Sequence, residues 1–130
     1  MKVGFTGTRF GMSYKQKEAL SNLLYETLDE EFHHGDCLGA DYEADSIARK
    51  WGYEIVIHPP EDKKYRAFCA QSGDTVWEPA PYLERNRDIV DSTDKLIAAP
   101  KSGKEELRSG TWATIRYARK MGKEVVILER

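Results

Sequence analysis

Three short segments of the chain combine glycine with side chains that can bind an anion. They are Thr6-Gly7-Thr8-Arg9, the stretch from Gly35 to Asp41, and Ser109-Gly110-Thr111. Glycine lets a ligand approach the backbone closely, and the N–H groups at the start of a helix favour a negative charge. Arginine can hold a phosphate through two parallel hydrogen bonds. Each segment alone is also typical of an ordinary turn, so their meaning depends on whether the fold brings them together.

Short apolar runs precede these segments and predict the strands that position them. We expect five strands, at residues 2–5, 31–34, 54–58, 95–99 and 124–128. Apolar residues between them recur at helical spacing, which predicts intervening helices. Ser13 followed by Gln16 has the pattern of a capping box, and Asp41 is expected to be the N-cap of the second helix. Pro81 suits the first turn of the third helix, and Ser109-Gly110-Thr111 leads into the last.

Alternating strands and helices predict an α/β fold built on a mostly parallel sheet, because a helix between two strands makes a crossover connection. The strands are short apolar runs without alternation, which indicates that helices cover both faces. We therefore expect a small, doubly wound, Rossmann-like fold of five strands in a single domain, residues 1–130. Residues 59–80 show no periodicity and are expected to form a long inserted loop. Ligands of such folds bind outside the carboxyl ends of the strands, where all three anion-binding segments are expected.

Composition excludes several classes of protein. The chain has 130 residues, and its 20 basic and 22 acidic side chains give a net charge of −2, which is unlike a basic nucleic-acid binder. No apolar run approaches the roughly 20 residues of a membrane span, and the first strand leaves no room for a signal peptide. Two cysteines are too few for a disulfide framework, so a reducing, cytoplasmic location is expected.

The two common nucleotide-binding fingerprints are absent. The sequence contains no G-x-x-x-x-G-K-[ST] segment, which disfavours an NTP-hydrolysing P-loop protein. It also has no G-x-G-x-x-G after the first expected strand, which disfavours an ordinary dinucleotide dehydrogenase. No cofactor is predicted.

Four motifs occur in an order that a known superfamily shares. They are Gly4-Phe5-Thr6-Gly7-Thr8-Arg9, His34-Gly35-Asp36-Cys37-Leu38-Gly39-Ala40-Asp41, Glu84-Arg85-Asn86-Arg87 and Arg108-Ser109-Gly110-Thr111-Trp112-Ala113-Thr114. In these motifs the chain resembles the SLOG superfamily, which contains the DNA-processing protein DprA/Smf, the LOG phosphoribohydrolases and small YspA-like proteins. The resemblance covers residues 3 to 128. The YspA-like branch fits best, because this chain is the bare fold.

The resemblance implies that the protein binds a nucleotide or nucleotide-derived small molecule, as a sensor or ligand-binding protein, and that it forms a homodimer or higher homo-oligomer. We expect the phosphate to meet the backbone of Gly7-Thr8 and Gly110-Thr111, with Arg9 and Arg85 balancing its charge and Asp41 bonding a ribose hydroxyl. The full set of expected ligand-binding residues is Thr6, Gly7, Thr8, Arg9, Gly35, Asp36, Gly39, Ala40, Asp41, Arg85, Asn86, Ser109, Gly110 and Thr111.

One departure from the LOG pattern bears on catalysis. LOG enzymes carry P-G-G-x-G-T-x-x-E, and aligning Gly110-Thr111 with its G-T places Thr114 where the catalytic glutamate stands. Cleavage of an N-glycosidic bond in a nucleoside phosphate therefore stays an alternative function, for which Asp36, Asp41 or Glu84 would have to supply the carboxylate. The catalytic residues of such an enzyme are not identified. DprA-like binding of single-stranded DNA is a third alternative, which the near-neutral charge does not favour.

Two further groups have both functional and structural interpretations. Arg85 and Arg87 are about 200° apart around a helix, so only one of them, expected to be Arg85, can face the ligand. His33 and His34 point to opposite faces of a strand, so they cannot bind one ion together, and no metal site is predicted. Cys37 is interpreted as a small buried residue. Tyr65, Phe68 and Trp77 in the long loop either stack on a base or pack the loop down.

Overall fold

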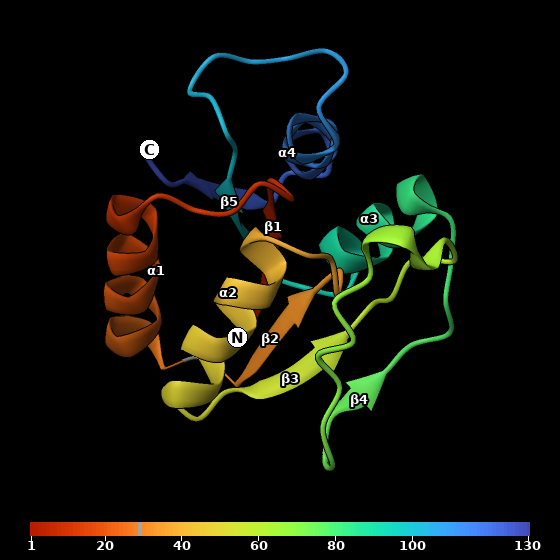
Figure 1. Cartoon of the computed structure of the whole chain (residues 1–130). Coiled ribbons are helices and arrows are strands. Elements are labelled where there is room, and N and C mark those ends of the chain that lie inside the picture. The colour runs from red at the N-terminus through yellow and green to blue at the C-terminus, as the bar shows by residue number, and fades with distance from the viewer. Residues whose placement is uncertain (29) are drawn as a thin grey trace.

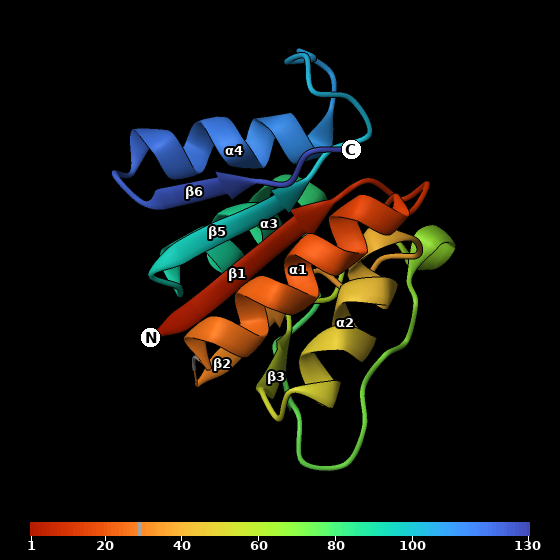
Figure 2. The same ribbon diagram turned by 90° about the vertical axis from the view of Figure 1, so that its left-hand side faces the viewer.

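The structure is a computed structural model that describes residues 1–28 and 30–130. Strands and helices alternate along the chain, as Figures 1 and 2 show. The strands are β1 (Lys2–Gly7), β2 (Glu31–His34), β3 (Glu54–Ile57), β4 (Thr75–Val76), β5 (Lys95–Ala99) and β6 (Glu124–Ile127). The helices are α1 (Tyr14–Thr27), α2 (Ala40–Lys50), α3 (Tyr82–Asp91) and α4 (Gly110–Lys120), with a short 3₁₀ turn η1 at Lys63–Tyr65.

The strands form one parallel sheet in the order β4-β3-β2-β1-β5-β6. The chain starts at β1, builds outward to β4, and returns through α3 to β5 on the other side of β1. The point at which strand order reverses therefore lies between β1 and β5, where doubly wound folds bind ligands. The predicted Rossmann-like architecture is confirmed, with six strands in place of five.

Two pairs of helices cover the sheet from opposite sides. α1 packs with α2 on one face, and α3 packs with α4 on the other (Figure 2). Phe5 on β1 and Phe32 on β2 pack with Leu20 and Leu24 of α1 in the first core. Leu96 and Ala98 of β5 pack with α4 residues such as Ile115 in the second. The residues of β1, β2, β3 and β5 are mostly buried on both sides because both faces of the sheet are covered.

The predicted helix starts are partly right. Ser13 is the N-cap of α1 and forms the expected capping box with Gln16, and Ser109 caps α4. The prediction that Asp41 caps α2 is wrong, because Gly39 is the N-cap and Asp41 lies inside the first turn. Gly39 has a φ of +89°, and a side chain there would collide with the backbone of Arg9. Glycine is therefore required where the loop after β1 crosses the start of α2.

The insert, residues 59–80, is held firmly against the sheet. It contains η1 and the two-residue strand β4, which the aperiodic sequence did not predict. Asp36, which has a φ of +58°, accepts hydrogen bonds from Arg66 Nε (2.9 Å) and from the backbone N of Cys69 (2.8 Å). Farther along, Arg49 of α2 pairs with Asp74 at 2.6 Å. The insert is thus a fixed wall beside the carboxyl ends of β2 and β3.

None of the helices in the described part of the chain combines the length and apolar character that crossing a membrane requires.

Candidate functional site

A cavity of about 550 Å³ opens at the carboxyl edge of the sheet, beside the ends of β1 and β5. Its walls come from the loop after β1, the end of β2, the insert, the start of α3, and the loop that leads into α4. This is the position that the strand order predicts for a ligand site. The volume lies within the range of small-molecule pockets.

Most of the residues expected from the sequence meet in this cavity. Those that line it are Thr6, Gly7, Thr8, Arg9, Gly35, Asp41, Arg85, Asn86, Ser109, Gly110 and Thr111. Three expected residues are not part of the lining. Asp36 is fully buried and binds the insert, whereas Gly39 and Ala40 pack α2 against the loop after β1, with Ala40 N donating to Thr8 O at 3.0 Å. These three residues therefore have structural roles in the fold, and their expected contacts with a ligand stay predictions.

The start of α4 presents backbone donors to the cavity. Ser109 Oγ accepts a hydrogen bond from Trp112 N at 3.2 Å and so caps the helix. Gly110 and Thr111 occupy the first turn, in which N–H groups have no carbonyl partner within the helix. Both residues line the cavity. Together with the positive end of the helix dipole, these N–H groups can hold a phosphate.

Asp41 is a buried carboxylate that lines the same cavity. Its side chain is 6% exposed, and Oδ2 accepts a hydrogen bond from Cys37 N at 3.2 Å. Oδ1 has no hydrogen-bond partner among the residues that the structure describes. Burial raises the pKa of Asp41 above its ordinary value, although His34 and Arg85 act in the opposite direction. An unpartnered buried oxygen is costly, so Asp41 is suited to accept a hydrogen bond from a bound molecule.

Arg85 lies in the cavity wall with its guanidinium already bonded. Nη1 donates to the carbonyl oxygens of Gly35 and, at 3.3 Å, of His58, and Nε donates to Asn86 Oδ1 at 2.8 Å. The residue is only 6% exposed. Arg85 therefore joins α3 to the ends of β2 and β3 and contributes positive charge beneath the cavity. Arg87 points elsewhere and stacks over Tyr117, in line with the prediction that the two arginines diverge.

Cys37 also lines the cavity, and its thiol lies 3.7 Å from Arg85 Nη2. Burial, with Asp41 nearby, raises the pKa of Cys37. A nucleophilic cysteine needs a lowered pKa, so this thiol is suited to packing and not to catalysis.

Several cavity residues were not predicted as ligand contacts. Phe10, Tyr65 and Tyr82 place aromatic rings around the cavity, and Lys101 and Arg108 add cations. Of these, the sequence singles out Tyr65, as a residue that either stacks on a base or packs the insert. The carboxylate of Glu106 was also missed, and its buried Oε1 has no hydrogen-bond partner in the described residues. Arg108 stands in the fourth sequence motif, whereas Phe10, Lys101 and Glu106 are isolated loop residues without a spacing pattern that could have marked them.

No protein-family model and no curated protein sequence matches the chain. The molybdenum cofactor binding protein from the phototrophic bacterium Rippkaea orientalis is 18% identical, with a TM-score of 0.73 over 97% of this chain and 74% of that one. The Moco carrier protein from Chlamydomonas reinhardtii is 20% identical, with a TM-score of 0.68 over 98% and 75%.

A third solved structure, DNA processing protein A (DprA) from Streptococcus pneumoniae, is 21% identical with a TM-score of 0.72. The match covers 97% of this chain and 49% of DprA. The fold is of the SLOG type. These identities are low, so the likeness establishes the SLOG-type fold and leaves the chemistry to the site itself.

Thr114, where the LOG motif has its glutamate, lies outside the cavity of this SLOG-type fold. Its Oγ1 donates to Gly110 O at 2.9 Å, and the residue is 2% exposed. Of the three carboxylates considered as substitutes, Asp36 holds the insert and Glu84 does not line the cavity. Asp41 is the one that does.

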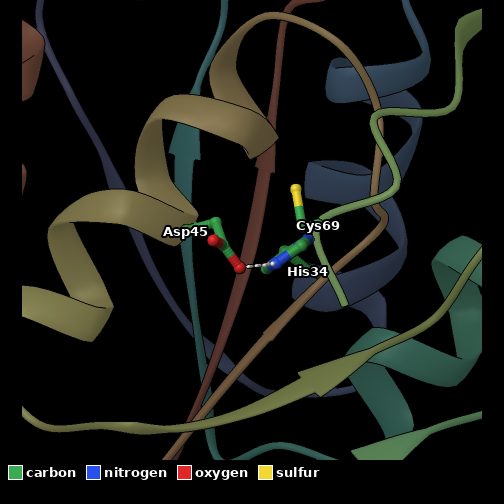
Figure 3. A group of neighbouring side chains, drawn as sticks. All are labelled: His34, Asp45 and Cys69. Carbon is green, nitrogen blue, oxygen red and sulfur yellow. Dashed lines mark hydrogen bonds and ion pairs between the residues drawn. The ribbon is translucent and has the colours of Figure 1, made fainter. Parts of the chain in front are cut away.

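His33 and His34 point to opposite faces of β2, as the sequence predicted. His34 lies with Asp45 and Cys69 in a group whose ligand atoms are within 4.8 Å of one another (Figure 3). Asp36 N donates to His34 Nδ1, so Nε2 carries the proton that bonds Asp45 Oδ1 at 2.8 Å. Arg49 Nε also bonds Asp45. These bonds occupy the polar atoms of His34 and Asp45, and the adjacent guanidinium disfavours a cation, so the group is a structural link between β2 and α2.

On the other face of β2, His33 Nδ1 lies 2.8 Å from His58 Nε2, and His33 Nε2 lies 2.8 Å from Glu31 Oε1. Trp77 of the insert covers His58, with ring centroids 4.3 Å apart. Burial, with His33 nearby, lowers the pKa of His58 to about 3. Burial also lowers the pKa of His33, although Glu31 acts in the opposite direction. Both imidazoles are therefore neutral in the folded protein at neutral pH.

Proposed function

We propose that the protein binds a nucleotide-derived small molecule in the cavity at the carboxyl edge of its sheet. The observation that carries this proposal is the convergence of three separate loops, after β1, β2 and β5, on one cavity at the reversal of strand order. The phosphate would bind at the N–H groups of Gly110 and Thr111. The base would lie among Phe10, Tyr65 and Tyr82, since aromatic rings commonly stack on nucleobases.

The charge around the cavity supports a phosphate. Arg9, Lys101 and Arg108 line it, and no residue in the ranges 1–28 and 30–130 forms an ion pair with any of the three. Arg9 and Lys101 instead lie 5.2 and 5.4 Å from the ring of Phe10. Contacts with a ring position a cation without neutralising it, so both charges stay available to an anion. Two of the structurally similar proteins are named for binding or carrying the molybdenum cofactor, which agrees with a small-molecule ligand.

Replacing Gly110 by proline tests the phosphate position. Gly110 is the first residue of α4, where proline is well tolerated and removes only the N–H group. Apart from its chain neighbours and its own helix backbone, a Cβ at this residue would meet no atom within 4 Å, and Ser109 has the extended backbone that a following proline prefers. We expect Gly110→Pro to weaken the binding of nucleoside 5′-monophosphates about tenfold, since a hydrogen bond to a charged group contributes roughly 1.5–3 kcal/mol.

The matched control is Gly110→Ala, which keeps the N–H group. Calorimetric titration of both variants with adenosine, guanosine, cytidine and uridine 5′-monophosphates measures the effect, and thermal unfolding confirms that both are folded. Equal affinity of the two variants would place the phosphate elsewhere. Absence of binding to the unaltered protein would contradict the proposed function.

Hydrolysis of the N-glycosidic bond is a second candidate, favoured by one observation. Asp41 and Glu106 both line the cavity, and each has a buried carboxylate oxygen without a partner among the described residues. A carboxylate can act as the general acid or base for such a cleavage. Chromatography of the same nucleotides after incubation separates the two functions, because an enzyme releases the free base with ribose phosphate and a binding protein returns the nucleotide intact.

The remaining expectations stay predictions. They are the YspA-like assignment, a single domain over residues 1–130, a cytoplasmic location, a homo-oligomer and the lack of nucleic-acid binding. Light scattering of the purified protein measures the oligomeric state, and titration with single-stranded DNA at two salt concentrations measures strand binding, which falls steeply as salt rises.

A further inference from the structure

Two residues that line the cavity each have a carboxylate oxygen that is buried without a partner among the described residues. Asp41 Oδ1 and Glu106 Oε1 are both buried without a hydrogen-bond partner in the part of the chain that the structure describes. The two residues come from different elements, the first turn of α2 and the loop before α4. A buried acceptor left unpaired costs roughly 1–3 kcal/mol. Two such acceptors in one cavity therefore indicate a ligand that brings two hydrogen-bond donors.

Glu106 lies close to the proposed phosphate position, and Asp41 lines the same cavity. Ser109 N donates to Glu106 O at 3.3 Å and closes a turn, so the Glu106 backbone is within about 7 Å of the residue that caps α4. Asp41 follows Ala40, whose N–H bonds Thr8 O, and Thr8 N in turn bonds Ala99 O at 3.0 Å. This chain of bonds ties the start of α2 to the ends of β1 and β5.

The position of the two acceptor oxygens indicates which hydrogen-bond donors of a nucleotide they would bind. In a nucleoside 5′-phosphate the sugar lies next to the phosphate, and the base lies beyond the sugar. Tyr65 and Tyr82, whose rings suit a base, come from the insert and from the start of α3. The sugar is therefore the part of the nucleotide that would lie beside Glu106, and its neighbouring 2′- and 3′-hydroxyls are two donors.

Asp41 offers one free oxygen, because Cys37 N already occupies Oδ2. A single oxygen suits one hydroxyl better than the paired N–H groups of a base edge, which need both oxygens of one carboxylate. Glu106 likewise has one buried oxygen free, so that each carboxylate can take one hydroxyl of a diol.

We propose that Asp41 and Glu106 bind the two hydroxyls of a ribose, so that the cavity selects ribonucleotides over deoxyribonucleotides. This inference rests on the proposed function and names the class of nucleotide that the site takes. A site built to bond a hydroxyl rejects the analogue without it, because its buried polar groups are then unpaired.

Paired titrations test the selection. The probes are the four ribonucleoside 5′-monophosphates, their 2′-deoxy counterparts and 3′-deoxyadenosine 5′-monophosphate, all at one ionic strength. We expect each ribonucleotide to bind at least tenfold more tightly than its 2′-deoxy form, whatever the base, and 3′-deoxyadenosine monophosphate to show a similar loss. Asp41→Asn and Glu106→Gln are each expected to bring the ratio of ribonucleotide to deoxyribonucleotide affinity towards one.

Glu105→Gln is the matched control, because Glu105 is the neighbouring carboxylate on the same loop, pairs with Arg116 at 2.9 Å and does not line the cavity. It should keep the full selection. Equal affinity for ribonucleotides and deoxyribonucleotides would overturn this inference and leave the proposed function standing. The same holds if Asp41→Asn and Glu106→Gln both retain the selection. Failure of every nucleotide to bind would overturn both.

Discussion

Asp41, which we propose as a binding residue, illustrates how such a residue is kept at a cost to stability. The chain places its carboxylate almost entirely out of water, with one oxygen unpartnered among the described residues. A charge in such surroundings is poorly solvated, which is why burial raises its pKa. Residues of this kind commonly mark functional sites, because a merely structural position would be better filled by a neutral side chain.

We expect Asp41→Asn to stabilise the folded protein at neutral pH while weakening ligand binding. The pKa of Asp41 is raised in the folded state, so at pH 7 the charged carboxyl disfavours folding relative to a neutral group. The amide removes that charge and can still accept the hydrogen bond from Cys37 N. Urea unfolding at pH 7 should show a gain of about 0.5–2 kcal/mol. This gain should shrink as the pH falls and the carboxyl becomes protonated; a loss of stability at pH 7 would contradict the account.

At the scale of elements, Arg49 joins the insert to α2 through its hydrogen bonds. Arg49 of α2 bonds Asp45 on its own helix, Asp74 in the insert and the carbonyl oxygen of Cys69. Asp74 also accepts a hydrogen bond from Gln71 N at 2.8 Å. Because β4 begins directly after Asp74, this network holds the edge strand and the wall of the cavity in place.

Arg49→Gln is expected to loosen the insert locally and to lower the free energy of unfolding by about 3 kcal/mol, because it leaves two largely buried carboxylates unpaired. Hydrogen exchange of the amides in residues 69–77 should quicken at least tenfold, with smaller changes in β1 and β5. Lys50→Gln, on the exposed neighbouring residue, is the control and should leave exchange in the insert unchanged. Uniform quickening over the whole sheet would show that Arg49 supports the fold generally.

At the scale of the whole molecule, the histidine pair links global stability to pH. His33 and His58 are buried against each other between β2 and β3, and the pKa of His58 is lowered to about 3. The pKa of a histidine in the unfolded chain is near 6.5. Below that pH the unfolded chain therefore binds a proton at residue 58 that the folded chain does not bind. The contribution of neutral His58 to the free energy of unfolding is therefore complete above pH 6.5 and is lost progressively as the pH falls from 6.5 towards 3.

We expect the free energy of unfolding to fall by about 1.4 kcal/mol between pH 7.5 and pH 5.5 from His58 alone. His58→Leu should lose clearly less over the same interval, because leucine has no proton to take up. Urea unfolding of both proteins at the two pH values and one ionic strength measures the difference. An identical loss in the variant would assign the acid sensitivity to other groups.

The order of strands and helices was predictable because its signals are local. Apolar runs mark β3 and β5, the Ser13–Gln16 capping box marks the start of α1, and Gly52 and Gly122 follow the ends of α2 and α4 in the left-handed conformation. β4 was not predicted because a strand of two residues is too short to show a periodic pattern of apolar side chains. β4 pairs with β3 because the insert is held in place by hydrogen bonds to Arg49 and Asp36, which lie earlier in the chain.

The sequence by itself determined a parallel α/β architecture and the edge at which a ligand would be expected, since periodicity, caps and strand polarity follow from neighbouring residues. Only the tertiary structure decided what each loop residue does. It turned Asp36 towards the insert and Asp41 towards the cavity, engaged Arg85 with backbone carbonyls, and brought Phe10, Tyr82 and Glu106 into the site. These roles depend on hydrogen bonds and packing between residues far apart in the chain, which leave no trace in local spacing.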